Sequence, residues 1–175
     1  MKKKALINTI LLHALLLVVV YVFQGVIFPY MRIGGLVPLL LPIASTGVAL
    51  YEGRYTGGVT GLFAGILCDI SFNQPVGTFT VFLTFSGLIV GAIADNLVLR
   101  GFVTYYVLCT VVLIVSAFVQ MFPLIISANA PPPQPLISTA IQQTLYSLIL
   151  AFPIWFSVQA LGKRAERMTS SGRAI

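Results

Sequence analysis

The sequence is poor in charged and titratable side chains. Only 8% of its 175 residues are charged, four residues are acidic, and there is one histidine. A soluble domain carries about 25% charged residues, so this chain cannot cover a water-exposed surface with polar groups. Because 58% of its residues are hydrophobic, the composition predicts an all-α, polytopic membrane protein.

The shortage of acidic residues also argues against an enzyme. Asp69 falls toward the outer side of the predicted bundle, whereas Glu52 and Asp95 fall at the inner side, so no carboxylate pair can flank one substrate. The sequence has no zinc-protease HExxH motif, no nucleophile elbow and no phosphate-binding loop. We therefore expect no catalysed reaction, no cofactor and no metal. A transport pathway is usually marked by several charged residues inside the membrane, and the apolar segments of this sequence contain few.

Cysteine is scarce, and the basic residues are dispersed. Cys68 and Cys109 lie inside apolar runs without the spacing of a metal site or a disulfide framework. We therefore expect both cysteines to be small, buried, hydrophobic side chains. The net charge of +6 comes from residues at the ends of apolar runs, with no basic stripe or patch. Nucleic acid is therefore not an expected partner.

Six apolar segments each approach the roughly 20 residues that a bilayer requires. They lie at about 5–28, 34–51, 56–72, 78–98, 102–126 and 136–161. The first is longer than the core of a signal peptide, which is about 7–15 residues, so we expect an uncleaved helix. We predict one six-helix transmembrane bundle over residues 1–162 and a short basic cytoplasmic tail over 163–175. Before the last helix, a stiff extended cap is predicted by Pro131, Pro132, Pro133 and Pro135.

The basic residues predict the orientation of the bundle. Cytoplasmic loops of membrane proteins are enriched in Lys and Arg. If the N-terminus is cytoplasmic, nine of the ten basic residues fall on the inner side, and only Arg32 falls on the outer side. This bias supports six membrane spans, with both termini in the cytoplasm.

The third segment carries a run of glycines that ends on an aspartate. On a helix of 100° per residue, Gly58, Gly61, Gly65 and Asp69 share an arc of about 80°, with Gly57 at its border. Small residues let membrane helices approach closely, so this face is a predicted packing groove. Two occupants are open: a neighbouring helix of the same chain, or a helix of another protein. A second small-residue pair on the fourth segment consists of Gly87 and Gly91.

Polar side chains inside a bilayer need partners. A carboxylate there costs about 2.5–3.5 kcal/mol on insertion scales, so Asp69 either caps or ties the following loop or finds a distant partner. The candidates are Ser71, Asn73, Thr78 and Arg32. Hydrogen bonds within the bundle are expected for His13, Gln24, Gln120, Gln142 and Gln143. Solvated interfacial positions are expected for Glu52, close to Arg54, and for Asp95, close to Arg100.

These features resemble the MreD family of rod shape-determining proteins. The resemblance rests on the stretch from Leu50 to Asp69, with its acidic-glycine-basic turn and its glycines, and on the loop in which Pro75 and Gly77 precede another apolar helix. Length, six spans and cytoplasmic termini match that family across nearly the whole chain.

The resemblance implies a non-enzymatic membrane scaffold of the bacterial cell-elongation and peptidoglycan-synthesis machinery. Its implied partners are an MreC-type single-span protein and membrane lipids, and indirectly MreB-type filaments and peptidoglycan synthases. The family is also similar in fold to the vitamin-binding S-components of energy-coupling factor transporters, which supplies the alternative function. S-components often carry an alanine-x-x-x-alanine pattern in the first helix. The run from Ala5 to Ala14 lacks that spacing, which disfavours the alternative.

Overall fold

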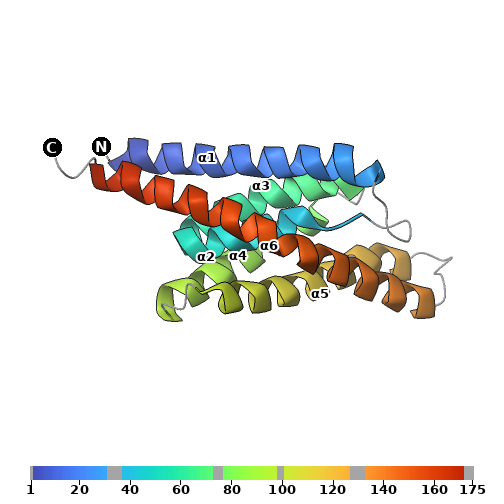
Figure 1. Ribbon diagram of the computed structural model, residues 1–175. Coiled ribbons are helices and arrows are strands. Elements are labelled where there is room, and N and C mark those ends of the chain that lie inside the picture. The colour runs from blue at the N-terminus through green and yellow to red at the C-terminus, as the bar shows by residue number, and fades with distance from the viewer. Residues whose placement is uncertain (1, 31–36, 73–76, 98–100, 127–132, 172–175) are drawn as a thin grey trace.

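The computed structural model describes residues 2–30, 37–72, 77–97, 101–126 and 133–171, which form an all-α bundle (Figure 1). Its helices are α1 (Lys2–Val22), α2 (Leu40–Glu52), α3 (Arg54–Phe72), α4 (Thr78–Leu97), α5 (Phe102–Ile126) and α6 (Pro133–Ser171), with a π-helical turn η1 (Phe23–Ile27) and a 3-10 turn η2 (Phe28–Tyr30) after α1. Within the described residues, five stretches are long and apolar enough to cross a membrane: Thr9–Ile27, Arg54–Phe72, Thr78–Asp95, Phe102–Gln120 and Ser138–Gly162. The prediction of an all-α polytopic membrane protein is confirmed.

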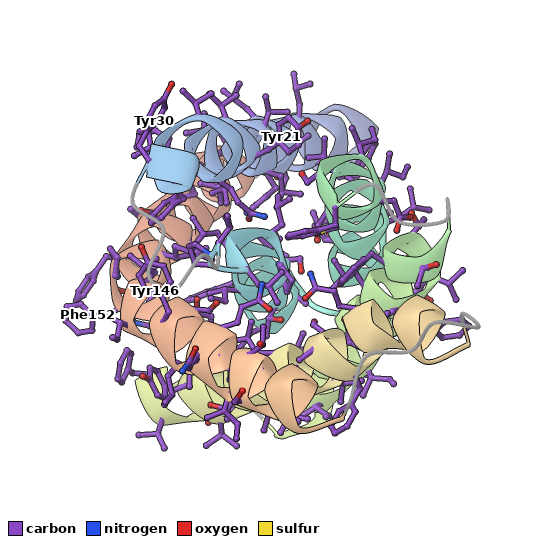
Figure 2. The ribbon with its side chains drawn as sticks, turned by 90° about the vertical axis from the view of Figure 1, so that its right-hand side faces the viewer. Tyr21, Tyr30, Tyr146 and Phe152 are labelled. Atoms are coloured by element: carbon purple, nitrogen blue, oxygen red, sulfur yellow. The ribbon has the colours of Figure 1, made fainter. Side chains whose placement is uncertain are left out.

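Helix α2 is shorter than its predicted segment and lies at the centre of the bundle. Its 13 residues extend about 20 Å at 1.5 Å per residue, whereas the hydrocarbon core of a bilayer is about 30 Å thick. Every residue from Leu40 to Leu50 is buried, and Figure 2 shows α2 ringed by the other helices. The predicted span at 34–51 is therefore wrong at its start, because the helix begins only at Leu40.

Two prolines explain the late start of α2. Residues 37–39 are not helical, and Pro38 disfavours the helical conformation of the residue before it. Pro42 is the third residue of α2, where its missing N–H removes no hydrogen bond, because the first N–H groups of a helix have no partner within it. The chain thus enters the bundle as non-helical backbone and becomes helical from Leu40.

The last helix is longer than predicted at both ends. Pro133 and Pro135 lie in the first turn of α6, where proline is well tolerated, so the extended cap is wrong for these two residues. Pro131 and Pro132 lie outside the described residues. At the other end, α6 continues as one helix to Ser171, so the basic segment prolongs the helix instead of forming a separate tail.

The start of α1 and the end of α6 lie at the same end of the bundle (Figure 1). Apolar side chains cover the outside. On α1, the outward residues follow helical spacing: Leu11, Leu15, Val18 and Val22 are each between 47% and 67% exposed. In Figure 2, Phe152 and Tyr30 also point away from the bundle. This apolar exterior suits contact with lipid.

An aromatic cluster fixes the C-terminal part of α2 against its neighbours. The ring centroid of Trp155 on α6 lies 4.6 Å from that of Tyr105 on α5 and 5.3 Å from that of Tyr51 on α2. Phe102 joins from the start of α5, with its centroid 5.9 Å from Trp155. Aromatic pairs at these separations add about 0.5–1.5 kcal/mol beyond the area that they bury, so three helices are tied together here.

Candidate functional site

The glycine-rich stretch lies on α3, whose closest neighbour in space is α4, and the two helices form an antiparallel hairpin. Asp69, 4% exposed, sits near the end of α3 and caps the start of α4. Its carboxylate accepts hydrogen bonds from the backbone N–H groups of Gly77 (2.9 Å), Phe79 (2.8 Å) and Thr80 (3.2 Å). The Thr80 hydroxyl donates a fourth, at 2.6 Å. The buried charge is therefore paired with a helix N-terminus, which has free N–H donors and a positive dipole end.

Two roles were considered for Asp69: a cap or tie of the following loop, or a bond to a distant partner. The structure shows the first, local role. The N–H groups that it binds belong to the first turn of α4 and to Gly77 just before that turn. Ser71 makes a different bond and donates to the carbonyl of Leu67 at 2.8 Å. Arg32 and Asn73 lie outside the described residues.

Asp95 repeats this arrangement at the opposite end of the hairpin. Its Oδ2 accepts a hydrogen bond of 3.2 Å from the backbone N–H of Arg54, the first residue of α3. Asp95 is exposed, so the expectation of a solvated side chain is confirmed, although its partner in the structure is the start of α3. Arg100, the expected neighbour, lies outside the described residues. Each helix of the hairpin thus ends near a carboxylate that caps the other helix.

Between these two caps, the backbones of α3 and α4 pack directly against each other. A Cβ atom at Gly57 would lie 2.8 Å from the carbonyl oxygen of Gly87. One at Gly61 would lie 2.9 Å from the carbonyl carbon of Leu83, and one at Gly65 would lie 2.7 Å from the carbonyl oxygen of Phe79. Real Cβ atoms essentially never come within 3.0 Å of such atoms, so these positions require glycine unless the helices separate.

The glycines of α4 match those of α3. A Cβ atom at Gly87 would lie 2.8 Å from the carbonyl carbon of Gly57, and one at Gly91 would lie 2.6 Å from the carbonyl carbon of Gly53. Gly58 differs, because its Cβ would meet only the flexible side chain of Leu88. The groove is therefore filled by α4 of the same chain, and the alternative of a helix from another protein in this groove is wrong.

The two turns of this region also use glycine for its backbone freedom. Gly53, between α2 and α3, has φ of +83°, and Gly77, before α4, has φ of +106°. Side chains rarely adopt these values. Gly77 therefore lets its N–H reach Asp69 at the start of α4. Pro75, the other predicted loop-shaping residue, lies outside the described residues.

A second polar constellation surrounds the start of α2. The side-chain oxygen of Gln24 accepts hydrogen bonds from the N–H groups of Leu40 (3.0 Å) and Leu41 (3.3 Å). Ser147 of α6 accepts one from the N–H of Leu39 at 2.9 Å. Because backbone groups buried in a membrane must be satisfied by protein, these side chains are what allow the chain to start a helix inside the bundle.

Gln143 completes this constellation, and its neighbour Gln142 does not take part. The Gln143 amide donates to the carbonyl oxygen of Val37 at 2.9 Å. Gln142 is exposed on α6, so a hydrogen bond inside the bundle is not its role. Gln24 lies on the π-helical turn η1 that follows α1, and it is 3% exposed between outward-facing neighbours.

His13 and Glu52 meet where α1 crosses the end of α2. His13 is fully buried, and its Nδ1 lies 2.7 Å from the carbonyl oxygen of Thr9. Its Nε2 lies 3.8 Å from a carboxylate oxygen of Glu52, whose side chain is 19% exposed. The sequence predicted a hydrogen-bonded histidine here but not its acidic neighbour, because Glu52 is 39 positions away in the chain.

Two apolar grooves open on the outside of the described bundle. One, of about 370 Å³, lies between α5 and α6 and is lined by small and branched residues such as Ala117, Ala140 and Thr144. The other, of about 360 Å³, lies between α1, α2 and α6 and includes Phe23, Leu40 and Pro153. Both are lined mainly by apolar side chains.

Comparison of the chain with protein-family models, with curated proteins and with solved structures found no match. The function of the chain is therefore inferred from the geometry of its hairpin and polar sites, together with the sequence resemblance.

Proposed function

We propose that this protein is a non-enzymatic membrane scaffold of the bacterial cell-elongation machinery and binds an MreC-type single-span protein. The observation that carries this proposal is the α3–α4 hairpin. The residues of the MreD-like stretch that the structure describes, from Leu50 to Asp69 and at Gly77, are the ones that build its turns, its glycine contact and its cap. Because the residues of this stretch serve rigid helix packing, they suit a protein that presents a fixed surface to its partners.

The carboxylates support a structural role in place of chemistry. Asp69 and Asp95 lie at opposite ends of α3, a helix of 19 residues and about 28 Å. Each is engaged with the first N–H groups of a helix. Two acids at such a separation cannot act on one bond, because paired catalytic carboxylates lie within about 10 Å of each other.

The charge distribution supports a location in the cytoplasmic membrane with both termini inside the cell. Nine of the ten basic residues fall on one side of the predicted bundle, and both termini lie at one end of the bundle (Figure 1). With this orientation the basic ends of α1 and α6 face anionic lipid headgroups, which attract such segments by about 1 kcal/mol for each Lys or Arg. Membrane lipids are thus further proposed partners, and MreB-type filaments and peptidoglycan synthases are indirect ones.

The alternative function, an S-component that binds a vitamin, would need free polar groups near the outer side. The start of α2 is the natural place for them, because half-helix ends inside transporters bind substrates. Here the N–H groups of Leu39, Leu40 and Leu41 are taken by Gln24 and Ser147. This favours the scaffold over the S-component.

One experiment separates the two functions. The native chain is co-expressed with an MreC-type single-span protein, purified in detergent and analysed by mass spectrometry for both protein and small molecules. We expect stoichiometric recovery of the single-span protein and no retained vitamin-like compound. Recovery of a bound small molecule without the single-span protein would instead support the S-component function.

A further inference from the structure

The contact between His13 and Glu52 has the geometry of a site that needs a proton. The Nδ1 atom of His13 lies 2.7 Å from the carbonyl oxygen of Thr9. A carbonyl oxygen can only accept a hydrogen bond, so Nδ1 must carry a hydrogen. In the neutral ring the other nitrogen, Nε2, then has only a lone pair.

That lone pair is buried and faces a carboxylate. Nε2 lies 3.8 Å from Oε1 of Glu52, and among the described residues it has no hydrogen-bond partner. A lone pair and a carboxylate oxygen are both acceptors, so they repel each other unless a hydrogen lies between them. With the hydrogen present, the contact becomes a charge-assisted hydrogen bond or an ion pair in a region of low dielectric constant, where such pairs are strong.

We propose that His13 and Glu52 together bind one proton, which fastens the cytoplasmic half of α1 to the end of α2. In the protonated state the proton sits between Nε2 and the carboxylate, while Nδ1–H stays on the Thr9 carbonyl. Loss of the proton leaves two acceptors facing each other and weakens this contact. The fastening is therefore present at low pH and is lost as the pH rises. This proposal is independent of the scaffold function.

Among the side chains that the structure describes, the charged group recorded against His13 is Glu52. Helix α1 packs against α2, α3 and α6. The Arg54 guanidinium donates to the Tyr55 hydroxyl at 2.9 Å and lies over that ring, Asp95 binds the N–H of Arg54, and Asp69 caps α4. The other titratable or charged positions on these elements are Tyr51, Cys68 and Tyr146, with Lys163, Arg164, Glu166 and Arg167 on the last turns of α6 and Lys2, Lys3, Lys4 and Tyr21 on α1 itself.

The chain offers an unusually direct test, because His13 is its only histidine. The full chain is labelled with ¹⁵N-histidine in detergent, and the protonation of each ring nitrogen is read by NMR between about pH 5.5 and about pH 8.5, a range in which histidine ordinarily changes charge. We expect Nδ1 to be protonated throughout and Nε2 to lose its hydrogen as the pH rises. Glu52→Gln should lower the protonated fraction of Nε2 at every pH in the transition. The glutamine side-chain amide can donate a hydrogen bond to the Nε2 lone pair and so favours the neutral ring.

Asp95→Asn is the matched control, since it removes another acid at the same end of the bundle that does not face His13, and it should leave the Nε2 signal unchanged. A second measurement is the melting temperature of the native chain and of Glu52→Gln over the same pH range. We expect a fall with rising pH in the native chain and a smaller fall in the variant. Identical Nε2 signals in the native chain and Glu52→Gln would overturn the proposal, as would equal falls in melting temperature or a ring whose single hydrogen is on Nε2.

Discussion

Asp69 and Asp95 cap each other's helices: the carboxylate near the end of α3 binds the first N–H groups of α4, and the carboxylate near the end of α4 binds the first N–H group of α3. A negative charge is unfavourable at the C-terminal end of its own helix and favourable at an N-terminal end. Because the two helices are antiparallel and packed through glycine, each carboxylate reaches the favourable end of its neighbour. The charges therefore hold the hairpin in register.

Removing the buried cap should destabilise the protein markedly. Loss of a cap costs about 0.5–2 kcal/mol, and each buried N–H left without an acceptor costs about 1–3 kcal/mol. Asp69→Ala leaves the N–H groups of Gly77, Phe79 and Thr80 without this acceptor, so we expect a loss of about 2 kcal/mol or more. The measurement is thermal unfolding in detergent.

Two further variants control this experiment. Asp69→Asn keeps one acceptor oxygen in place and should be intermediate. Asp95→Ala removes an exposed cap, and the backbone N–H of Arg54 can then bind water instead. The loss of stability should therefore be near the lower end of the range for caps. Equal melting temperatures for Asp69→Ala and Asp95→Ala would contradict the greater importance of the buried cap.

Glycine is required at the buried α3–α4 contact but not at the open position of Gly25. Gly61→Ala places a methyl group against the Leu83 carbonyl, and overpacking of this kind costs about 1–3 kcal/mol. Gly25→Ala is the matched control, because its Cβ would have no atom within 4 Å and alanine favours helix. We expect a lower melting temperature for Gly61→Ala and an unchanged or higher one for Gly25→Ala. The reverse order would show that the helices do not pack as described.

The buried start of α2 gives a prediction that compares two adjacent glutamines. Gln143→Leu removes the donor to the Val37 carbonyl and leaves a buried acceptor unpaired, at a cost of about 1–3 kcal/mol. Gln142→Leu changes an exposed residue of the same type and should be neutral or stabilising in a membrane. Hydrogen exchange of the Leu39 to Leu41 amides should rise only in Gln143→Leu. Faster exchange in both variants would contradict a specific tie at this point.

The sequence predicted the α3–α4 pair better than any other part of the molecule. Glycines at helical spacing and a buried aspartate are local signals whose meaning follows from membrane physics. The start of α2 was not predicted, because hydropathy reports apolar character and not helix length. Pro38 and Pro42 carried the missing signal.

Contacts between distant segments were the other part that the sequence could not give. Gln24 was expected to make a hydrogen bond, but its target, the start of α2, depends on how α1 passes over that helix. The approach of His13 to Glu52 depends on the same crossing. Periodicity on one helix cannot supply that geometry, and neither can it show that the basic segment after residue 162 continues α6.

The orientation of the bundle is testable by chemical labelling. A cysteine at Gln134, at the start of α6, should react with a membrane-impermeant reagent from outside intact cells. A cysteine at Ser170 should react only after the membrane is opened. Background should be low, because Cys68 and Cys109 are buried. Reaction of both positions from the same side would contradict the proposed topology.

The most direct test of the scaffold function is recovery of an MreC-type single-span protein by equal amounts of three folded chains: the native chain, Gly25→Leu and Gly61→Leu. Gly25→Leu adds a side chain where nothing lies within 4 Å, and Gly61→Leu adds the same side chain between α3 and α4. We predict full recovery by the native chain and by Gly25→Leu, and strongly reduced recovery by Gly61→Leu together with a lower melting temperature. Failure of the native chain to recover the single-span protein, or equal recovery by all three, would contradict a scaffold whose binding surface depends on the glycine-packed hairpin.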